Sequence, residues 1–361
     1  MDPDFDETQL LLQTTTRRYL EGEVPFDRVR EHEEKCRADQ ELWQAMAGQG
    51  WLGVALPEAV GGGGAGLVEA GILVHELARR AAVVPGVEVM ASAVVLARHA
   101  DVDQSALLRG IVDGEVVVVP ALLEAGDDFA QVDAAVDAGG KLSAEKRFVD
   151  YPDFATHHLV SAHGPEGLGL YLIERGDAAI ETEARSCTGR TPQADVRYRG
   201  ASARRVAGES AIGRLLDIGR ALTAAQILGS MEVSLEMTVE YTNLRVQFGQ
   251  PLATFQAVQH HAADMCMHVE SNRFLVYELL DSLERGTAGS ADAALVKASV
   301  SRSVPFVTMQ AHQLHGGQGL IEENDLYFFT IRGKDRSLAW GTAEECLAQV
   351  AEDVESPPRW L

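Results

Sequence analysis

The sequence predicts an α+β protein in which a β-rich segment separates two helical segments. Two changes in the spacing of apolar residues support this prediction: the helical spacing ends near residue 113 and returns near residue 208. We therefore expect an N-terminal helical domain at 1–112, a central β-domain at 113–207 and a C-terminal helical bundle at 208–361. A chain of 361 residues is long enough for such a division.

Apolar residues recur every three or four positions in the N-terminal segment, and this spacing predicts helices. The predicted helices cover 7–20, 38–48, 70–82 and 91–99. The stretch 56–66 contains a GxGxxG pattern, but a helix and a turn precede it instead of a strand. We interpret it as a flexible connection and not as a dinucleotide site.

The central and C-terminal segments differ in the length of their apolar patterns. Short runs separated by Gly, Pro and Asp predict a small β-barrel or sandwich rather than a parallel sheet; they lie at 116–119, 141–144, 158–161, 168–173 and 194–199. Long helical patterns then predict an antiparallel bundle; they lie at 214–244, 254–283, 291–313 and 343–354.

Composition excludes several classes of function. A net charge of −23 argues against nucleic-acid binding, which needs a clustered positive surface. No apolar run is long enough to span a membrane, and the acidic N-terminus does not resemble a signal peptide, so we expect a cytoplasmic protein. The four cysteines lie far apart, without metal-ligand spacing, and no HExxH pattern occurs.

Two motifs in the C-terminal segment have the chemistry of a nucleotide site. The first is R-x-x-F-G followed by a glutamine, at Arg245, Phe248 and Gln256; the second is Q-x-x-G-G, beginning at Gln313. Arginine binds a pyrophosphate in a bidentate manner, and paired glycines let the backbone approach a ligand. Taken singly, each motif has a purely structural explanation: a helix-end charge, a core aromatic residue or a helix stop.

Together the two motifs closely resemble the FAD-adenylate-binding signatures of the acyl-CoA dehydrogenase family, and the resemblance is strongest over 213–342. It implies that family's fold, FAD as cofactor and an acyl-CoA thioester as substrate. In the family, one subunit holds the flavin ring and the adjacent subunit holds the adenylate. The implied cofactor-binding residues are Arg245, Gln247, Phe248, Phe255, Gln256, Gln313, Leu314, Gly316 and Gly317.

The chain departs from the family where the catalytic glutamate should be. One family position for this base is occupied by Gly219 and the other by Trp340. Neither residue can accept the α-proton of an acyl thioester, so no catalytic residue is assigned. Asp217 and Arg220 match positions that contact the CoA adenine in relatives, although a charge pair at a helix start explains them equally well.

The β-domain departs from the family as well. Leu123 replaces a threonine that donates to the flavin, and Asp150 places a negative charge where a reduced, anionic flavin should be stabilised. The resemblance therefore implies that this chain's own flavin-ring cleft is degraded while its adenylate-binding surface is intact.

These features suggest a base-less subunit of a heteromeric acyl-CoA dehydrogenase, similar to the degenerate subunit of the α2β2 enzymes that actinobacteria use on steroid side-chain CoA thioesters. Its partner would be a homologous, glutamate-bearing subunit, and the isolated chain would be inactive. One alternative is a self-sufficient flavoenzyme with a displaced base; another is a scaffold or acyl-CoA-binding subunit without flavin. The acids near enough to replace the base are Asp217, Glu232, Glu236 and Glu344.

Overall fold

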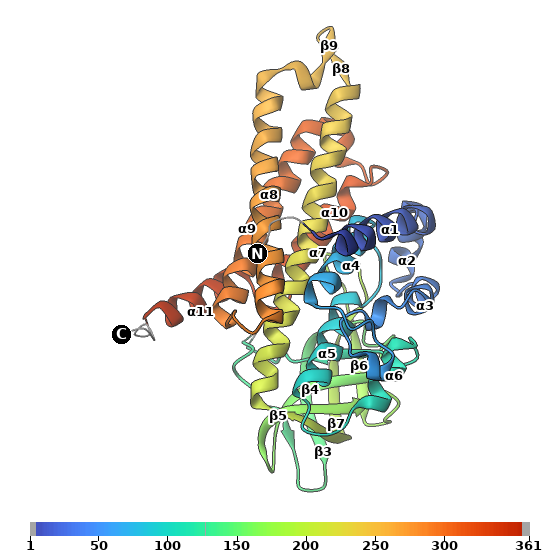
Figure 1. The fold of residues 1–361 in the computed structure, drawn as a ribbon, viewed down its shortest axis with the longest axis vertical. Helices are drawn as coiled ribbons and strands as arrows, with labels where there is room; N and C mark the ends of the chain where they lie inside the picture. The colour runs from blue at the N-terminus through green and yellow to red at the C-terminus, as the bar shows by residue number, and fades with distance from the viewer. Residues whose placement is uncertain (1–4, 127, 356–361) are drawn as a thin grey trace. The chain divides into compact units, whose positions relative to one another are not determined.

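The computed structural model describes residues 5–126 and 128–355 (Figure 1). The chain forms two compact units, each assembled from separate stretches of sequence. The first contains the residues up to Asp27, Gly71–Ala82 and the residues from Arg220 on; the second contains Arg28–Ala70 and Val83–Gly219. The domain bounds 1–112, 113–207 and 208–361 stay predictions, and their outer ends lie outside the described residues.

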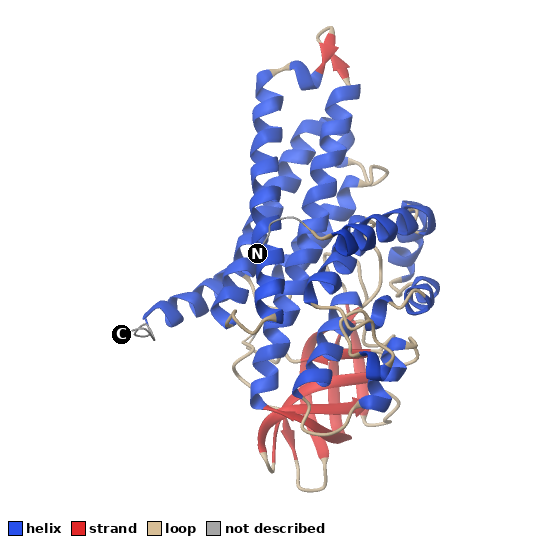
Figure 2. Cartoon of the chain, in the orientation of Figure 1, coloured by secondary structure: helices blue, strands red, loops and turns tan. Residues whose placement is uncertain are grey.

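A closed β-sheet forms the centre of the second unit (Figure 2). The pairing path β4–β2–β3–β7–β5 returns to β4, and β1 adds to β4 in parallel. The sheet is thus a barrel, which is one of the two predicted alternatives, but it is mixed because β1 and β2 both pair with β4 in parallel. The strands are β1 (Val118–Ala121), β2 (Ala135–Val136), β3 (Lys141–Asp150), β4 (His157–Gly164), β5 (Gly167–Glu174), β6 (Ile180–Arg185) and β7 (Gln193–Gly208).

A bulge at Gly200 lets the long strand β7 pair with three neighbouring strands. Leu142 pairs with Ala201, but the next residue, Ser143, pairs with Arg199, so Gly200 is the extra residue. Its φ of 81° is a left-handed conformation that glycine adopts without strain. Because a bulge bends and twists a strand, β7 can pair with β6 before this point, with β5 beyond it, and with β3 on both sides of it.

Helices surround the barrel in the second unit. The helix α5 is buried along its first eleven residues, Gly86 to Leu96, and packs on β1. The glycine-rich loop is ordered, since the amides of Gly63 and Gly64 donate to the carbonyls of Gly53 and Leu56, both at 2.9 Å; the prediction of a flexible connection was wrong. The helices are most of α2 (Phe26–Lys35), α3 (Gln40–Gly48), α5 (Gly86–His99) and α6 (Ser105–Val112).

The first unit is a helical bundle, which Figures 1 and 2 show with α8 and α9 side by side. The helices α10 and α11 also pack on α9. Gly229 allows α7 to approach α4 closely, because a Cβ there would collide with the backbone oxygen of His75. The elements are α1 (Glu7–Glu23), most of α4 (Leu67–Arg79) and of α7 (Glu209–Leu244), α8 (Gln256–Glu284), α9 (Ser290–His315), α10 (Leu326–Leu338) and α11 (Ala343–Glu355).

The predicted α+β architecture is confirmed: helices, then a β-barrel, then a helical bundle. Among the described residues, three helices (α2, α6 and α10) and four strands (β2, β6, β8 and β9) escaped prediction.

Candidate functional site

The first motif forms a short hairpin between α7 and α8, made of β8 (Val246–Gln247) and β9 (Gln250–Pro251). The two turn residues, Phe248 and Gly249, have φ values of 54° and 83°. A two-residue hairpin turn with both φ values positive suits the twist of the strands and favours glycine. Phe248 occupies the other position at a cost of about 1–2 kcal/mol, and its side chain is 90% exposed.

Arg245 lies at the base of this hairpin with its side chain exposed. Its amide donates to the carbonyl of Tyr241 at 2.8 Å, and its carbonyl accepts from the amide of Leu252 at 2.9 Å. Its guanidinium makes no hydrogen bond or ion pair with any residue that the structure describes. The backbone is thus fixed while the charged group remains available. Gln247 and Gln256 are exposed as well, and Phe255 packs edge-on against Phe248.

The second motif ends α9 and continues into the 3₁₀ turn η4 (Gly316–Leu320). A Cβ added to Gly316 or to Gly317 would meet no atom within 4 Å, whereas one on Gly319 would lie 3.0 Å from the Cβ of His315. The turn therefore folds back on α9 at Gly319 and leaves the Gly316–Gly317 backbone open. Gln313 is exposed and Leu314 is half-buried on the last helical turn.

The structure brings the two motifs together through a stacked pair that the sequence analysis missed. The rings of Tyr241 and His315 lie 4.4 Å apart at 20°. Tyr241 precedes Arg245 by one helical turn, and His315 directly precedes Gly316. Their positions beside the two motifs can be read from the sequence, but the contact between the two rings cannot.

The two positions at which a base was expected are Gly219, on α7, and Trp340, in the loop between α10 and α11. Trp340 is 8% exposed, its φ is 60°, and its carbonyl accepts from the Nε of Arg220 at 3.0 Å. The Nη1 of Arg220 donates to the Oε1 of Gln349 at 2.8 Å, so this guanidinium is used inside its own unit. Gly219 is buried on α7. Asp217 is buried also, with a carboxylate oxygen 3.6 Å from the Nη1 of Arg214.

A buried lysine holds the loop that carries Trp340. The Nζ of Lys297 donates to the carbonyls of Ser337 and Gly341 at 3.0 and 3.1 Å and to the hydroxyl of Ser301 at 2.9 Å. Burial lowers the pKa of Lys297 to about 7. Together with Arg220, this side chain fixes the loop from 337 to 341.

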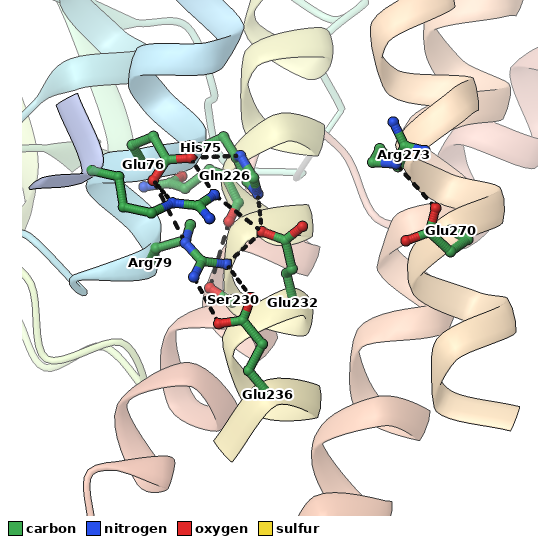
Figure 3. A network of polar contacts seen from close by, with 10 residues as sticks. His75, Glu76, Arg79, Gln226, Ser230, Glu232, Glu236, Glu270 and Arg273 are labelled. Atoms are coloured by element: carbon green, nitrogen blue, oxygen red, sulfur yellow. Dashed lines mark hydrogen bonds and ion pairs between the residues drawn. The ribbon is translucent and has the colours of Figure 1, made fainter. Parts of the chain in front are cut away.

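Two of the acids proposed as displaced bases belong to an ion-pair network between α4 and α7 (Figure 3). Glu232 pairs with Arg79 and lies 3.1 Å from the Nε2 of His75, while Glu236 pairs with Arg79 at 2.7 Å. Burial would raise the pKa of Glu232, but His75, Arg79 and Arg17 hold it well below the usual range. A carboxylate stabilised in this way is a weak base. Glu344, the remaining acid on the C-terminal side, is exposed.

The hairpin of Arg245 and the loop of Trp340 are far apart within one chain. Both Arg220 and Tyr241 lie on α7, and Arg245 follows its last residue. Along a helix, 25 residues at about 1.5 Å each span roughly 37 Å. This separation exceeds the length of an extended FAD molecule. The two regions are therefore separate sites on the same unit.

In the β-barrel, the residues at the family's flavin-ring positions are held by protein groups. Asp150 is 9% exposed and accepts from the Nε2 of Gln193 at 3.1 Å. Leu123 is half-buried and offers no hydroxyl. Phe148 has a φ of 52° and is 40% exposed, with the guanidinium of Arg147 4.7 Å from the ring centre.

A buried ion pair lies beside these positions. The Nζ of Lys146 contacts a carboxylate oxygen of Glu124 and donates to the carbonyl of Leu122 and the hydroxyl of Ser161, both at 3.1 Å. Glu124 in turn accepts from the amide of Asp133 at 2.9 Å. Burial lowers the pKa of Lys146, and Glu124 opposes part of that shift. The pair fixes the segment that follows β1.

The residues at 5–126 and 128–355 also bear on metal sites and membrane spans. No group of three or more histidine, cysteine or acidic side chains there is arranged to hold a metal ion. No helix among those residues is both long and apolar enough to cross a membrane.

Comparisons with known proteins agree with this architecture. The model of the acyl-CoA dehydrogenase N-terminal domain matches residues 6–115, and that of the C-terminal domain matches 207–355. The acyl-CoA dehydrogenase FadE27 of Mycobacterium tuberculosis is 29% identical over 339 residues, which cover 89% of this chain and 90% of the relative.

Two solved structures are similar over almost their whole length. A variant of the Tcur3481-Tcur3483 steroid ACAD is 32% identical, with a TM-score of 0.91 over 96% of this chain and 98% of its own. A chain of the ChsE4-ChsE5 complex from Mycobacterium tuberculosis is 26% identical, with a TM-score of 0.90 over 99% of this chain and 100% of its own. This chain belongs to the acyl-CoA dehydrogenase family, a family of FAD-dependent oxidoreductases.

Proposed function

We propose that this chain is the base-less subunit of a heteromeric acyl-CoA dehydrogenase and completes the FAD site of a homologous, glutamate-bearing partner. The complex would be an α2β2 assembly in the cytoplasm. The four cysteines are free, as expected in a reducing compartment. The observation that carries the proposal is the roughly 37 Å of helix between Arg220 and Arg245, which separates this chain's adenylate motif from its own base region.

The residues present fit the adenylate half of FAD. Arg245 offers an exposed guanidinium for the pyrophosphate, and Gly316–Gly317 offers open backbone beside it. The residues at the ring positions fit less well, because Leu123 cannot donate a hydrogen bond and Asp150 is acidic. Bound FAD supplies the hydride acceptor for α,β-dehydrogenation; this chain's contribution would be to hold and orient the nucleotide.

The substrate class follows from relatives and is part of the proposal. One similar structure is a variant of the Tcur3481-Tcur3483 steroid ACAD, and another belongs to the ChsE4-ChsE5 complex. We propose an acyl-CoA thioester with a bulky acyl group, such as a steroid side chain. A vacated second site would give such a substrate room. Asp217 and Arg220 would face the CoA adenine only if Arg220 left Trp340 and Gln349.

A self-sufficient enzyme with a displaced base is less well supported. Glu232 and Glu236 are ion-paired with Arg79, and Asp217 is buried near Arg214. A scaffold without flavin would leave the exposed arginine and the strained Phe248 turn without a role.

The test compares the isolated chain with its complex. We expect the wild-type chain and the Trp340→Glu variant, each expressed alone, to show no turnover of acyl-CoA thioesters and little yellow colour. A restored acid does not repair Leu123 or Asp150. Co-expression with a glutamate-bearing partner should give an active, flavin-containing complex. Substantial turnover by the isolated wild-type chain would contradict the proposal, and turnover by Trp340→Glu alone would contradict a degraded ring cleft.

A further inference from the structure

The two halves of the adenylate site come from segments far apart in sequence, and the stack of Tyr241 on His315 is their direct link. The ring centres lie 4.4 Å apart at an interplanar angle of 20°, within the range of stacked aromatic pairs. Tyr241 is tied to Arg245 by the backbone hydrogen bond that ends α7. His315 is the last residue of α9 and precedes Gly316. The stack therefore joins the base of one motif to the base of the other.

The histidine is arranged to serve as a neutral ring. It is 4% exposed, and its Nδ1 lies 2.8 Å from the carbonyl of Ala311. Only a protonated Nδ1 can donate to a carbonyl, so the hydrogen is on Nδ1 in the neutral ring. Burial lowers the pKa of His315, which favours this neutral form. One ring edge is thus anchored to α9, while a ring face meets Tyr241.

A second histidine fixes the far end of the same turn. The Nδ1 of His312 lies 2.6 Å from the carbonyl of Gly319, and its Nε2 lies 2.7 Å from the hydroxyl of Thr330 on α10. In a neutral ring, Nδ1 donates to the carbonyl and Nε2 accepts from the hydroxyl. The turn Gly316–Leu320 is thus held to α9 and α10 from inside, so its position relative to α7 depends on the Tyr241–His315 contact.

We propose that Tyr241 and His315 are positioning residues for the FAD adenylate: their stack sets the distance between Arg245 and Gly316–Gly317, so that one nucleotide can contact both. Neither ring needs to touch the nucleotide for this role. The inference rests on the proposed function, because it assumes that these motifs hold FAD. A site whose parts are already in register loses less conformational freedom on binding, and loss of the stack should weaken affinity.

The experiment uses the complex co-purified with its partner, stripped of flavin and titrated with FAD while flavin fluorescence is followed. Two variants remove a ring, His315→Ala and Tyr241→Ala, and two matched controls keep one, His315→Phe and Tyr241→Phe. A stacking contribution of this kind corresponds to an affinity loss of about 3- to 10-fold for the alanine variants. Tyr241→Phe should bind FAD like the wild type, and His315→Phe, which keeps a ring but loses the bond to Ala311, should bind FAD more tightly than His315→Ala.

Arg245→Ala in the same titration distinguishes a failure of this inference from a failure of the proposed function. If Arg245→Ala weakens FAD binding and both alanine variants bind normally, the positioning role is overturned and the adenylate site stands. If Arg245→Ala binds normally, the proposed function itself fails. A phenylalanine variant as weak as its alanine counterpart would also overturn the stacking role. Thermal melts of each complex identify any variant that has lost its fold. If the buried His315 cannot be replaced without unfolding, the variants of the half-buried Tyr241 still test the stack.

Discussion

Phe248 shows how much a single residue can indicate about a site. Its bulky side chain is 90% exposed, and its backbone is in a left-handed conformation that costs free energy in the isolated chain. Backbone strain of this kind concentrates at functional sites. Its neighbour Arg245 has an exposed and uncommitted guanidinium, whereas Arg220 on the same helix is bonded to Trp340 and Gln349. The environment of each arginine, and not its residue type, indicates which one awaits a ligand.

The role of Arg245 can be measured by its removal. Arg245→Ala should lower the FAD affinity of the complex about 10- to 150-fold, since a charge-assisted hydrogen bond contributes about 1.5–3 kcal/mol. The measurement is bound FAD per complex by absorbance, beside a circular-dichroism melt. Arg18→Ala, which removes another exposed arginine of the same unit, is the matched control and should bind FAD normally. Equal occupancy in both variants would mean that the motif is a relic.

At the level of elements, the loop between α10 and α11 depends on two buried cations. Arg220 donates to the carbonyl of Trp340, and Lys297 donates to those of Ser337 and Gly341. The backbone of this loop is fixed, with Trp340 and Gly341 at φ values of 60° and 107°. The arrangement makes stability depend on the ionisation of Lys297.

We predict that Lys297→Met changes how stability varies with pH. The pKa of Lys297 is about 7 in the folded chain against 10.5 for an ordinary lysine, so between these values the unfolded chain binds a proton that the folded chain does not. Stability must then rise with pH over this window, by at most about 1.4 kcal/mol per pH unit from this group. Below pH 7, Lys297 is protonated in both states, and burial of its charge lowers the free energy of unfolding by a constant amount.

The check is the free energy of unfolding in urea at several pH values from 7 to 10, for the wild type and the variant. Methionine has no charge to titrate. The variant's free energy of unfolding should therefore rise less steeply with pH, by the amount that Lys297 contributes to the wild-type slope. The loss of three hydrogen bonds moves the whole curve but not its slope. Parallel curves would show that Lys297 keeps an ordinary pKa.

The elements that the sequence predicted have long or regular apolar patterns, and those that it missed do not. In α2, the buried residues are Val29 and Glu33 amid charged neighbours, so the pattern is weak. In α10, Gly333 and two buried arginines obscure a helix that packs against α9, where a Cβ on Gly333 would collide with Val304. The strand β2 has two residues. Such elements are determined by their neighbours in space.

The candidate site shows the same limit. Arg245, Phe248 and Gly316 could be identified because their motifs are continuous in sequence. The stack of Tyr241 on His315 could not, since it depends on how α7 packs beside α9. The hydrogen bond from Arg220 to the carbonyl of Trp340 could likewise not be predicted, because it joins residues 120 positions apart.

On the scale of the whole molecule, exposed apolar side chains on two helices of the bundle are consistent with the proposed assembly. Met267 and Phe274 on α8 are 63% and 46% exposed, and Leu295 and Met309 on α9 are 49% and 60% exposed. Each pair is separated by a multiple of seven residues, so its members lie on one face of their helix. Clustered exposed apolar side chains mark protein contacts. A partner subunit would cover them and would bring its own flavin ring to the adenylate motif of this chain.

The most direct test of this account is the flavin content of the complex formed with a glutamate-bearing partner. Flavin released from the purified complex is quantified by absorbance and compared with the subunit ratio. If this chain supplies an adenylate half but holds no ring, the complex should contain one FAD for each pair of unlike subunits. Two FAD molecules per pair, or flavin retained by this chain alone, would contradict the account.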